Sequence, residues 1–289
     1  MLLKEMTPVL VRTKLAAFIT ILSALWLTGC GRTAGPQEVL DTIIFPNKWV
    51  GNIDKIEFNE PSGICWHAQR GTLFVVGDEG NLCEITTEGA LVKQTLLREA
   101  ADFEGITYDP STGLLYLVIE EAEAILEVHP ESFEILREFS VPRTFEGKTL
   151  LAAGGEGIEA LTFIPDAQHP EGGVFYVGNQ AFTLSNPEDI SAVFRVELPL
   201  RTRRGPVRIT GYFEPGIIDL SALNYDATTD HILLVSDATN TMLEYSRDDR
   251  LLNIWAFPGD NQEGVTVDDE GFIYIAQDSG GIIKLKWLR

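Results

Sequence analysis

A short pattern of polar and apolar positions returns five times along the chain. Each copy starts with acidic or polar residues, passes through a small residue into an alternating strand, and continues through a turn into a second strand. The copies cover 60–67, 102–109, 157–163, 219–226 and 261–268. Alignment on Gly63, Gly105, Ala160, Ala222 and Gly264 gives spacings of 42, 55, 62 and 42 residues. Repeats of about 40–50 residues are typical of β-propeller blades.

Within a repeat, the apolar runs predict four strands. In the second unit they fall at about 105–109, 115–119, 125–129 and 135–139, with Pro110 and Gly113 placed as a tight turn requires. Second strands such as 73–76 and 232–235 are apolar on both faces, as suits a strand packed between neighbouring blades. The pattern predicts an all-β propeller, most simply with five blades. Six blades would require splitting the 55- or 62-residue unit, and neither contains eight strands.

The last unit supplies only three strands before the chain ends, at about 263–267, 272–276 and 281–285. We expect the segment 53–58 to provide the missing fourth strand, because pairing the two ends of the chain in one blade removes an exposed sheet edge. One propeller domain is therefore expected over residues 49–289.

The N-terminal residues carry a targeting pattern instead of a blade. Lys4, Arg12 and Lys14 precede an apolar run over 15–27, and Leu-Thr-Gly then leads into Cys30. This pattern predicts a bacterial lipoprotein signal over 1–29 with Cys30 lipidated by fatty acids such as palmitate, and a tether over 30–48. A plain transmembrane anchor is the alternative, but a span needs about 20 apolar residues. We expect a membrane-anchored protein of the cell envelope that faces the periplasm or the exterior.

The net charge of −21 makes a nucleic-acid partner improbable, because such binding relies on clustered Lys and Arg. Cations, small molecules or a protein ligand remain as partners. Two further cysteines, Cys65 and Cys83, are separated by a predicted strand at about 9–10 Å, so we expect two buried thiols, with a disulfide as the alternative in an oxidising compartment.

Propeller topology places the start of strand one and the end of strand two on the same face of each blade. The polar segments of the repeat lie at these two places, before strand one and after strand two. Together they contain more than ten carboxylates and no Lys or Arg. The innermost side chains should be those of Ser62, Glu104, Glu159, Ser221 and Glu263. This face is therefore the expected working surface.

Carboxylates gathered around a narrow channel repel one another, so either some are protonated or a cation lies among them. A hydrated funnel without an ion is the third interpretation. Oxygen ligands without Cys or His favour Ca²⁺. The candidate calcium ligands are Glu60, Glu104, Glu159, Asp219 and Glu263. The candidate ligand-binding residues at the same mouth are Asp78, Glu79, Glu120, Asn179, Asp237, Asn240 and Asp278.

Three stretches carry a resemblance to a known family. They are Glu-Pro-Ser-Gly-Ile at 60–64, Gly-Asp-Glu-Gly at 77–80, and Phe-Glu-Gly-Ile at 103–106 followed by the Glu pair at 120–121. These stretches resemble the SdiA-regulated family, a group of bacterial envelope β-propellers similar in general pattern to NHL-repeat and phytase-like propellers. The resemblance extends over roughly 50–289 and implies the fold and the envelope location, without an activity.

The function hypothesis is a binding or interaction module with a calcium-binding acidic mouth. A calcium-dependent phosphoesterase or lactonase-like hydrolase on the same mouth is the alternative, with Glu104, Glu159 and Glu263 holding the metal. In that alternative Asp237, Asn240 or Asp278 would orient water or substrate. A purely structural scaffold is the third possibility, and the sequence does not decide whether the protein is an enzyme.

Overall fold

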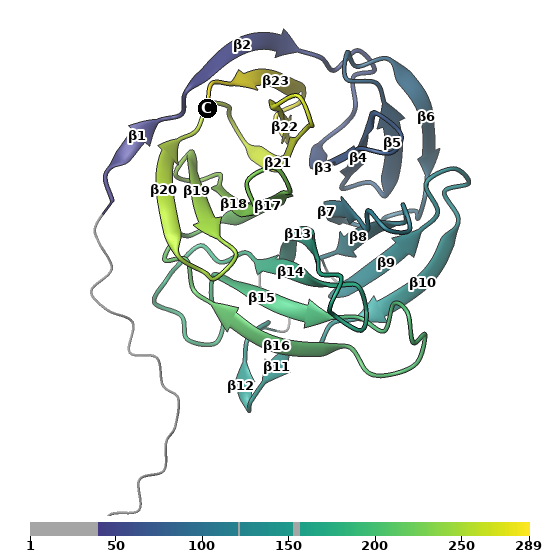
Figure 1. Cartoon of the computed structure of the whole chain (residues 1–289), viewed down its shortest axis with the longest axis vertical. Coiled ribbons are helices and arrows are strands. Elements are labelled where there is room, and N and C mark those ends of the chain that lie inside the picture. The colour runs from purple at the N-terminus through teal and green to yellow at the C-terminus, as the bar shows by residue number, and fades with distance from the viewer. Residues whose placement is uncertain (1–39, 121, 153–156) are drawn as a thin grey trace, which may run out of the picture. The chain divides into compact units, whose positions relative to one another are not determined.

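Four-stranded antiparallel sheets form the repeating element of the computed structural model (Figure 1), which describes residues 40–289 except 121 and 153–156. The first blade has the strand order β3-β4-β5-β6, and the next two are β7-β8-β9-β10 and β13-β14-β15-β16. The fourth is β17-β18-β19-β20 with β1 added at its outer edge, and the fifth is β21-β22-β23-β2. The prediction of an all-β, five-bladed propeller is therefore confirmed.

The strands are named here by their place in the blade. The inner strands are β3 (Pro61–His67), β7 (Phe103–Tyr108), β13 (Ile158–Pro165), β17 (Leu220–Asp226) and β21 (Gln262–Val267). The second strands are β4 (Thr72–Gly77), β8 (Leu115–Ile119), β14 (Gly173–Asn179), β18 (His231–Ser236) and β22 (Phe272–Gln277). The third strands are β5 (Asn81–Ile85), β9 (Ala124–Val128), β15 (Ala192–Glu197), β19 (Thr241–Ser246) and β23 (Ile282–Trp287). The outer strands are β6 (Leu91–Leu96), β10 (Ile135–Ser140), β16 (Arg208–Phe213), β20 (Leu251–Ala256) and β2 (Asn47–Asn52).

The inner strands pack against one another around the ring, and β21 contacts β3 to complete it. Small residues make this close approach possible. A Cβ on Gly63 would lie 2.0 Å from the carbonyl oxygen of Glu104, and one on Gly105 would lie 2.4 Å from the backbone nitrogen of Leu161. The glycines that anchor the repeat thus let the neighbouring blades meet at the centre.

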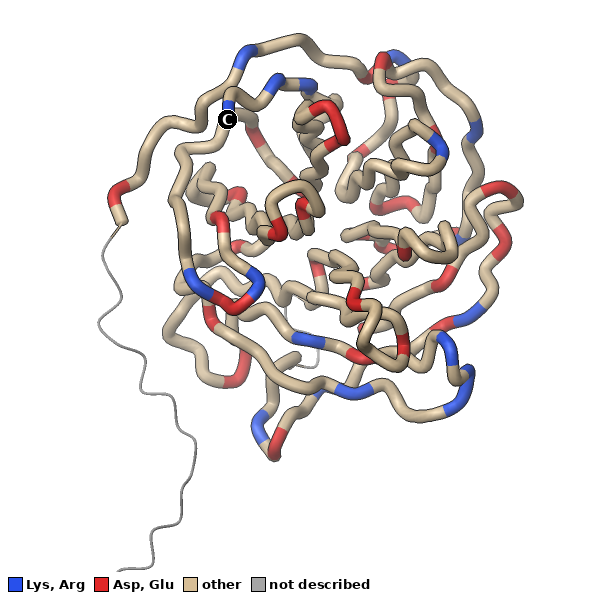
Figure 2. The backbone as a smooth tube through the Cα atoms, in the orientation of Figure 1, with Lys and Arg blue, Asp and Glu red and all other residues tan. Residues whose placement is uncertain are grey.

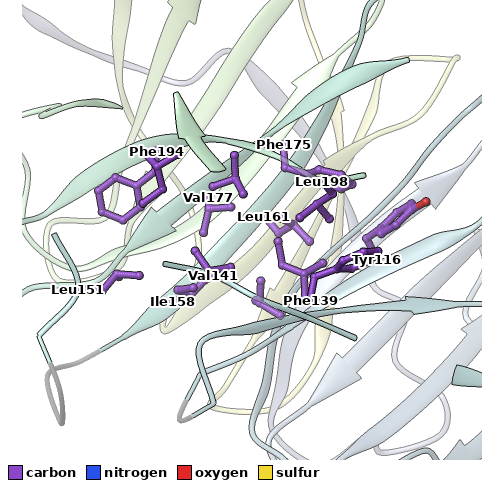
Figure 3. Close-up of a cluster of buried hydrophobic side chains, with 14 of the residues drawn as sticks. Tyr116, Phe139, Val141, Leu151, Ile158, Leu161, Phe175, Val177, Phe194 and Leu198 are labelled. Atoms are coloured by element: carbon purple, nitrogen blue, oxygen red, sulfur yellow. The ribbon is translucent and has the colours of Figure 1, made fainter. Parts of the chain in front are cut away.

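Apolar side chains fill the spaces between neighbouring blades. Between the second and third blades, Tyr116 and Phe139 pack with Leu161, Phe175 and Val177, all at most 8% exposed (Figure 3). Strands β8, β13 and β14 are buried on both faces because each face meets a different blade. Cys65 and Cys83 are buried free thiols on either side of β4, as their spacing predicted.

The closing strand lies earlier in the chain than the sequence pattern predicted. β2 pairs with β23 and completes the fifth blade, but it covers Asn47–Asn52 instead of 53–58. In the predicted segment Asp54 accepts hydrogen bonds from the backbone nitrogens of Ile56 and Phe58, which folds it into a loop. Ile56 and Phe58 alternate with polar residues, as in a strand, and they pack with Ile53 in the core between the fifth and first blades. Burial of a loop therefore produced the pattern of a strand.

The predicted tether over 30–48 is also too long, because β1 (Thr42–Ile44) and the start of β2 lie within it. β1 runs parallel to β20, and Phe45, 1% exposed, packs against Trp255, Phe257 and Trp287. The expected signal over 1–29, Cys30 and the tether up to residue 39 lie outside the described residues. A hairpin of β11 (Thr144–Phe145) and β12 (Lys148–Thr149) belongs to the insertion between the second and third blades. In the described part of the chain, no helix is long and apolar enough to span a membrane.

Removal of the closing strand should be far more damaging than removal of the preceding residues. Without residues 1–52, β23 loses its outer partner, β2, and presents an unpaired edge, which favours unfolding and association. We expect the melting temperature to fall by at least about 10 °C relative to a protein that lacks only residues 1–39. Circular dichroism melting and size-exclusion chromatography of the two truncations test this. Equal melting curves and monomeric elution of both would show that β2 does not close the ring.

Candidate metal and ligand site

A β-bulge at the same place in every blade builds the centre of the candidate site. The pairing of each inner strand with its second strand shifts register near the start of the inner strand. The shifts lie between Pro61 and Gly63, Phe103 and Ile106, Ile158 and Ala160, Leu220 and Ala222, and Gln262 and Gly264. The residues inside these bulges include Ser62, Glu104, Glu159, Ser221 and Glu263. A bulge leaves its extra residue out of the ladder and redirects that side chain, so the five blades place these five residues in equivalent positions.

The loops that follow the second strands are tied to the same place. The backbone nitrogens of Glu120, Asp237 and Asp278 donate to the carbonyl oxygens of Asp102, Asp219 and Asn261, at 3.0–3.3 Å. The polar segments before the inner strands and those after the second strands therefore lie on one face. Asp and Glu occur in the inner loops, whereas most Lys and Arg positions follow the outer strands (Figure 2). We call the group Asp78, Asp102, Glu104, Glu120, Glu159 and Glu263 the acidic mouth.

The backbone next to the bulges is held in a sparsely populated conformation. Two residues before the bulged position, Glu60, Asp219 and Asn261 have φ angles of 44°, 55° and 51°. Left-handed residues other than glycine cost about 1 kcal/mol each and concentrate at functional sites. The third blade has Gly157 at this position, where φ is 91° without that cost.

The tightest group in the acidic mouth joins two blades. Asp78, Asp102 and Glu104 each offer one oxygen, and these three atoms all lie within 4.8 Å of one another. Ligand oxygens on one Ca²⁺, each about 2.3–2.6 Å from the ion, lie at most about 5 Å apart. Ser62 Oγ donates to Asp78, which holds that carboxylate in place. Oδ1 of Asp102 is buried without a hydrogen-bond partner among the described residues, so an acceptor there has no donor.

A second contact links the same group to the third blade. The carboxyl group of Glu120 lies in hydrogen-bonding contact with those of Asp102 and Glu159. Burial, together with the hydrogen bond and the charge of Asp102, raises the pKa of Glu120 to about 8. Burial also raises the pKa of Glu104 and of Glu159 well above the usual range, and the charges of Glu159 and Glu120, respectively, add to the effect. Either these carboxyl groups share protons with one another, or a cation lies among them.

Two further carboxylates of the acidic mouth also have raised pKa values. Burial raises the pKa of Glu263 to about 8, with the charges of Asp237 and Asp219 as further causes. Burial raises the pKa of Asp78 to about 6, against the hydrogen bond from Ser62. None of the ion pairs formed within the described residues involves a carboxylate of the acidic mouth.

A cationic side chain reaches the edge of this face. Arg143 lies 3.1 Å from Glu123, in the loop that follows β8. Burial nevertheless raises the pKa of Glu123 to about 7, because Arg143 offsets only part of the desolvation. The sequence analysis missed Arg143, which comes from the insertion after β10 and shares no position with the repeat.

Two of the predicted calcium ligands lie outside the acidic mouth. Asp219 accepts hydrogen bonds from Gln180 and from the backbone of Ala238, and Glu60 is exposed beside Asn59. Of the five predicted calcium ligands, Glu104, Glu159 and Glu263 lie in the acidic mouth. Asp102 was absent from the predicted set although it contributes to the tightest group. Its place two residues before Glu104, in the clearest copy of the repeat, was the signal that could have found it.

The predicted ligand-binding residues divide in the same way. Asp78 and Glu120 belong to the acidic mouth, and Glu79 and Asp278 lie beside it in the loops after the second strands. Asn179 is fully buried and donates to the carbonyl oxygen of Ile190, so it holds a loop in place. The remaining two fix the start of the last inner strand: Asp237 accepts from the backbone nitrogen of Gln262 and Asn240 from its side chain.

The channel behind the acidic mouth is too narrow for a ligand. The cavity between the inner strands, lined by Gly63, Gly105, Ala160, Ser221 and Glu263 among others, has a volume of about 10 Å³. That is about the space of one water molecule. An ion or a ligand on this face would therefore bind at the mouth, with part of its surface open to solvent.

The raised pKa values predict an unusual dependence of stability on pH in the absence of metal. Glu120 and Glu263, with pKa values of about 8, keep protons in the folded protein that they lose at ordinary values near 4.5 when unfolded. Their protonated forms contribute stability that is complete at pH values below 4.5 and is lost as the pH rises through 8. With a chelator present, the melting temperature should fall by about 5 °C or more between pH 5 and pH 8.5.

Thermal unfolding in EGTA across this range tests the pH prediction, and Glu263→Gln should flatten the profile because the amide cannot lose a proton. A melting temperature that rises steadily from pH 5 to pH 8.5 would contradict it.

The geometry defines the class of protein as a five-bladed β-propeller with an acidic mouth on one face. A comparison with family models matches residues 50–280 to the SdiA-regulated family. The match covers most of the chain, and the protein belongs to this family. The comparison with curated proteins gave no match.

The chain is also similar to solved structures. A glutaminyl cyclase from Myxococcus xanthus is similar with a TM-score of 0.61 and 12% identity, over 85% of this chain and 98% of that one. A streptogramin B lyase matches with a TM-score of 0.48 and 13% identity, over 83% of this chain and 98% of the other. A virginiamycin B lyase from Staphylococcus aureus has a TM-score of 0.42 and 17% identity, over 82% and 73% of the two chains. At 12% identity, the likeness to the glutaminyl cyclase shows the fold alone.

Proposed function

We propose that this protein is an envelope lipoprotein whose propeller binds calcium at the acidic mouth and, through the ion or the surrounding loops, a ligand or partner protein. The observation that supports this most is the repeated β-bulge, which directs Glu104, Glu159 and Glu263 to equivalent places on one face. A scaffold without a ligand there would not need three buried acids in those positions. Ser and Thr would satisfy the same backbone geometry without desolvating charge.

Calcium fits the donor set better than other metals. All the groups are carboxylates and hydroxyls, and Ca²⁺ takes 6–8 oxygen ligands in flexible arrangements. Asp78, Asp102 and Glu104 come from two blades, and the unpartnered Oδ1 of Asp102 is the kind of acceptor that an ion satisfies. A bound Ca²⁺ would offset the desolvation and the mutual repulsion that raise the pKa values of Asp78 and Glu104.

The loop after β14 offers a surface for a larger ligand beside the ion. Phe182 and Leu184 are 54% and 59% exposed, which is unusual for large apolar side chains in a loop. The carbonyl oxygen of Ala181 accepts from the backbone nitrogen of Asp219, so this loop is tied to the same face as the acidic mouth. A ligand or partner with a polar group at the ion and an apolar portion on this loop would use both features.

Isothermal titration calorimetry tests the calcium proposal. We expect Ca²⁺ to bind the chelator-treated protein with a Kd of about 10⁻⁵ M or tighter, within the range of protein calcium sites. Mg²⁺ should bind much more weakly, because it demands a small octahedral site and gives up its water reluctantly. The absence of both heat and a shift in melting temperature at about 10 mM Ca²⁺ would rule the site out.

The lipoprotein part of the proposal is supported by the sequence pattern before Cys30 and can be tested separately. Cells that express the full chain should incorporate labelled palmitate into it, and the protein should fractionate with membranes. Cys30→Ser should abolish both, while Cys65→Ser, which alters a buried thiol, should leave labelling intact. Labelling of Cys30→Ser at the level of the unaltered chain would overturn the assignment.

A calcium-dependent hydrolase of phosphoesters or lactones is the second candidate. Glu120 favours it, because its carboxyl group contacts Asp102 and Glu159 beside the candidate metal site, where it could pass a proton to or from a substrate. Hydrolysis of phosphoester or lactone substrates that depends on calcium and is lost in Glu120→Gln would move the assignment to this class. Calcium binding without turnover of either class would support the binding module.

A further inference from the structure

The end of the channel opposite the acidic mouth holds a second, chemically different pocket. It has a volume of about 110 Å³ and receives residues from the C-terminal ends of all five inner strands. One position of the repeat supplies its aromatic residues: Trp66, Tyr108, Phe163 and Tyr225, with Val267 in the fifth blade. We call the pocket lined by these residues and their immediate neighbours the distal pocket. Phe163 is 3% exposed, but the other three aromatic side chains are only half-buried, so their rings remain available to a ligand.

The preceding position of the repeat locks neighbouring blades together. Oγ1 of Thr107 accepts from the backbone nitrogen of Phe163 at 3.1 Å, and Oγ1 of Thr162 accepts from that of Tyr225 at 2.9 Å. Oγ1 of Thr266 accepts from the backbone nitrogen of Trp66 at 3.0 Å. Each threonine therefore satisfies a backbone donor of the next blade. The same groups line the distal pocket.

This arrangement leaves donors without acceptors. Thr266 donates to Oδ1 of Asn224, and Nδ2 of Asn224 is buried with no partner in the described part of the chain. Within that part, the hydroxyl protons of Thr107 and Thr162 also have no acceptor. A buried amide donor that is left unsatisfied costs about 1–3 kcal/mol. The fold gives no reason for such a cost at Asn224, because threonine or serine there could accept the hydrogen bond from Thr266 equally well.

The charges around the distal pocket exclude an anion. Asp226, Asp268 and Asp269 lie among its residues, and Asp269 is exposed at the rim. Asp226 is paired with Arg289, and Asp268 accepts from the hydroxyl of Tyr274 at 2.8 Å. A carboxylate or phosphate would meet net negative charge here. A neutral acceptor, such as a carbonyl oxygen, would meet the free donors without that repulsion.

We propose that the distal pocket binds a small, neutral, flat molecule with an amide-type carbonyl oxygen. The oxygen accepts from Nδ2 of Asn224 and from the hydroxyl of Thr107 or Thr162. The flat body lies against Trp66, Tyr108 and Tyr225. The size suits a single ring, because a cavity of about 150 Å³ holds benzene and the distal pocket also opens to solvent. This site is separate from the acidic mouth and requires no metal.

Benzamide is the probe, since it combines one ring with a neutral carbonyl acceptor. Ligand-observed NMR should show benzamide binding to the full chain with millimolar affinity, unchanged by EGTA, and benzoate should not bind. Asn224→Asp keeps the acceptor for Thr266 but removes the Nδ2 donors and adds charge, so it should weaken benzamide at least tenfold. Asn186→Asp is the matched control, because its side-chain oxygen can still accept from the backbone of Glu188 in an exposed loop.

Ala227→Trp covers the case in which Asn224→Asp fails to fold. Ala227 lies at the exposed rim of the distal pocket, where a large side chain would obstruct the opening without entering the core. Benzamide binding should be lost in this variant while the melting temperature stays within a few degrees of the unaltered protein. Failure of benzamide to bind at about 10 mM, equal binding of benzoate, or unchanged affinity in both variants would overturn the proposal.

Discussion

The double variant Glu104→Gln, Glu159→Gln is expected to lose calcium-dependent stabilisation. Both side chains come from bulges, are at most 8% exposed, and have no cationic partner in the part of the chain that the structure describes. Their removal takes away two negative charges next to the ion, so we expect calcium affinity to fall by about 100-fold, or about 2.7 kcal/mol. The measurement is the melting temperature across a calcium titration.

The metal-free variant distinguishes this explanation from a general loss of packing. Glutamine resembles a protonated glutamic acid, so the double variant in EGTA should be at least as stable as the unaltered protein. Glu134→Gln is the matched control, because Glu134 is exposed in a turn and its side chain forms no contact at the acidic mouth. A double variant that is less stable in EGTA and keeps its response to calcium would show that the two acids serve the fold and not an ion.

Among the glycines of the inner strands, Gly63→Ala is expected to have the largest effect on stability. The new Cβ would lie 2.0 Å from the carbonyl oxygen of Glu104 and 2.7 Å from Cγ2 of Val76. Backbone atoms cannot move aside as a flexible side chain can, so the first two blades must separate. We expect a loss of about 3 kcal/mol, and a fall in melting temperature of about 6–12 °C.

Gly147→Ala supplies the comparison for this substitution. Nothing lies within 4 Å of a Cβ there, although its φ of 82° carries the strain of a left-handed residue. That strain costs about 1 kcal/mol, well below the expected effect at Gly63. Because the clash at Gly63 involves the backbone of Glu104, calcium affinity should fall together with stability. Equal melting temperatures for the two variants would show that the blades do not meet as closely as described.

The repeat carried most of the information about the fold. Polar phrase, small residue and alternating strand recur because each blade needs the same bulge and the same close approach at the centre, as Gly63 and Gly105 show. The closing strand was misplaced because burial of Ile56 and Phe58 in a loop gives the same alternation as a strand. Local pattern reports which side chains are buried, but not what pairs with the backbone between them.

The candidate site was predicted in outline and not in membership. Position in the repeat located Glu104, Glu159 and Glu263, because equivalent bulges point equivalent side chains the same way. Repeat position could not show that Asp219 accepts hydrogen bonds from Gln180 and from the backbone of Ala238. Such contacts join loops of different blades, and their partners follow no period. The distal pocket was missed for the opposite reason: its aromatic residues have the repeat position of ordinary core side chains, and only their partial exposure shows that they line an opening.

The most direct test of the central claim is a diffraction experiment on crystals grown with calcium. At a long X-ray wavelength, Ca²⁺ gives an anomalous signal that identifies the ion without reference to coordination. We expect one peak at the acidic mouth, about 2.3–2.6 Å from oxygens of Asp78, Asp102 and Glu104. An ordered mouth without a peak, in which these carboxyl groups hydrogen-bond only to one another and to water, would contradict it.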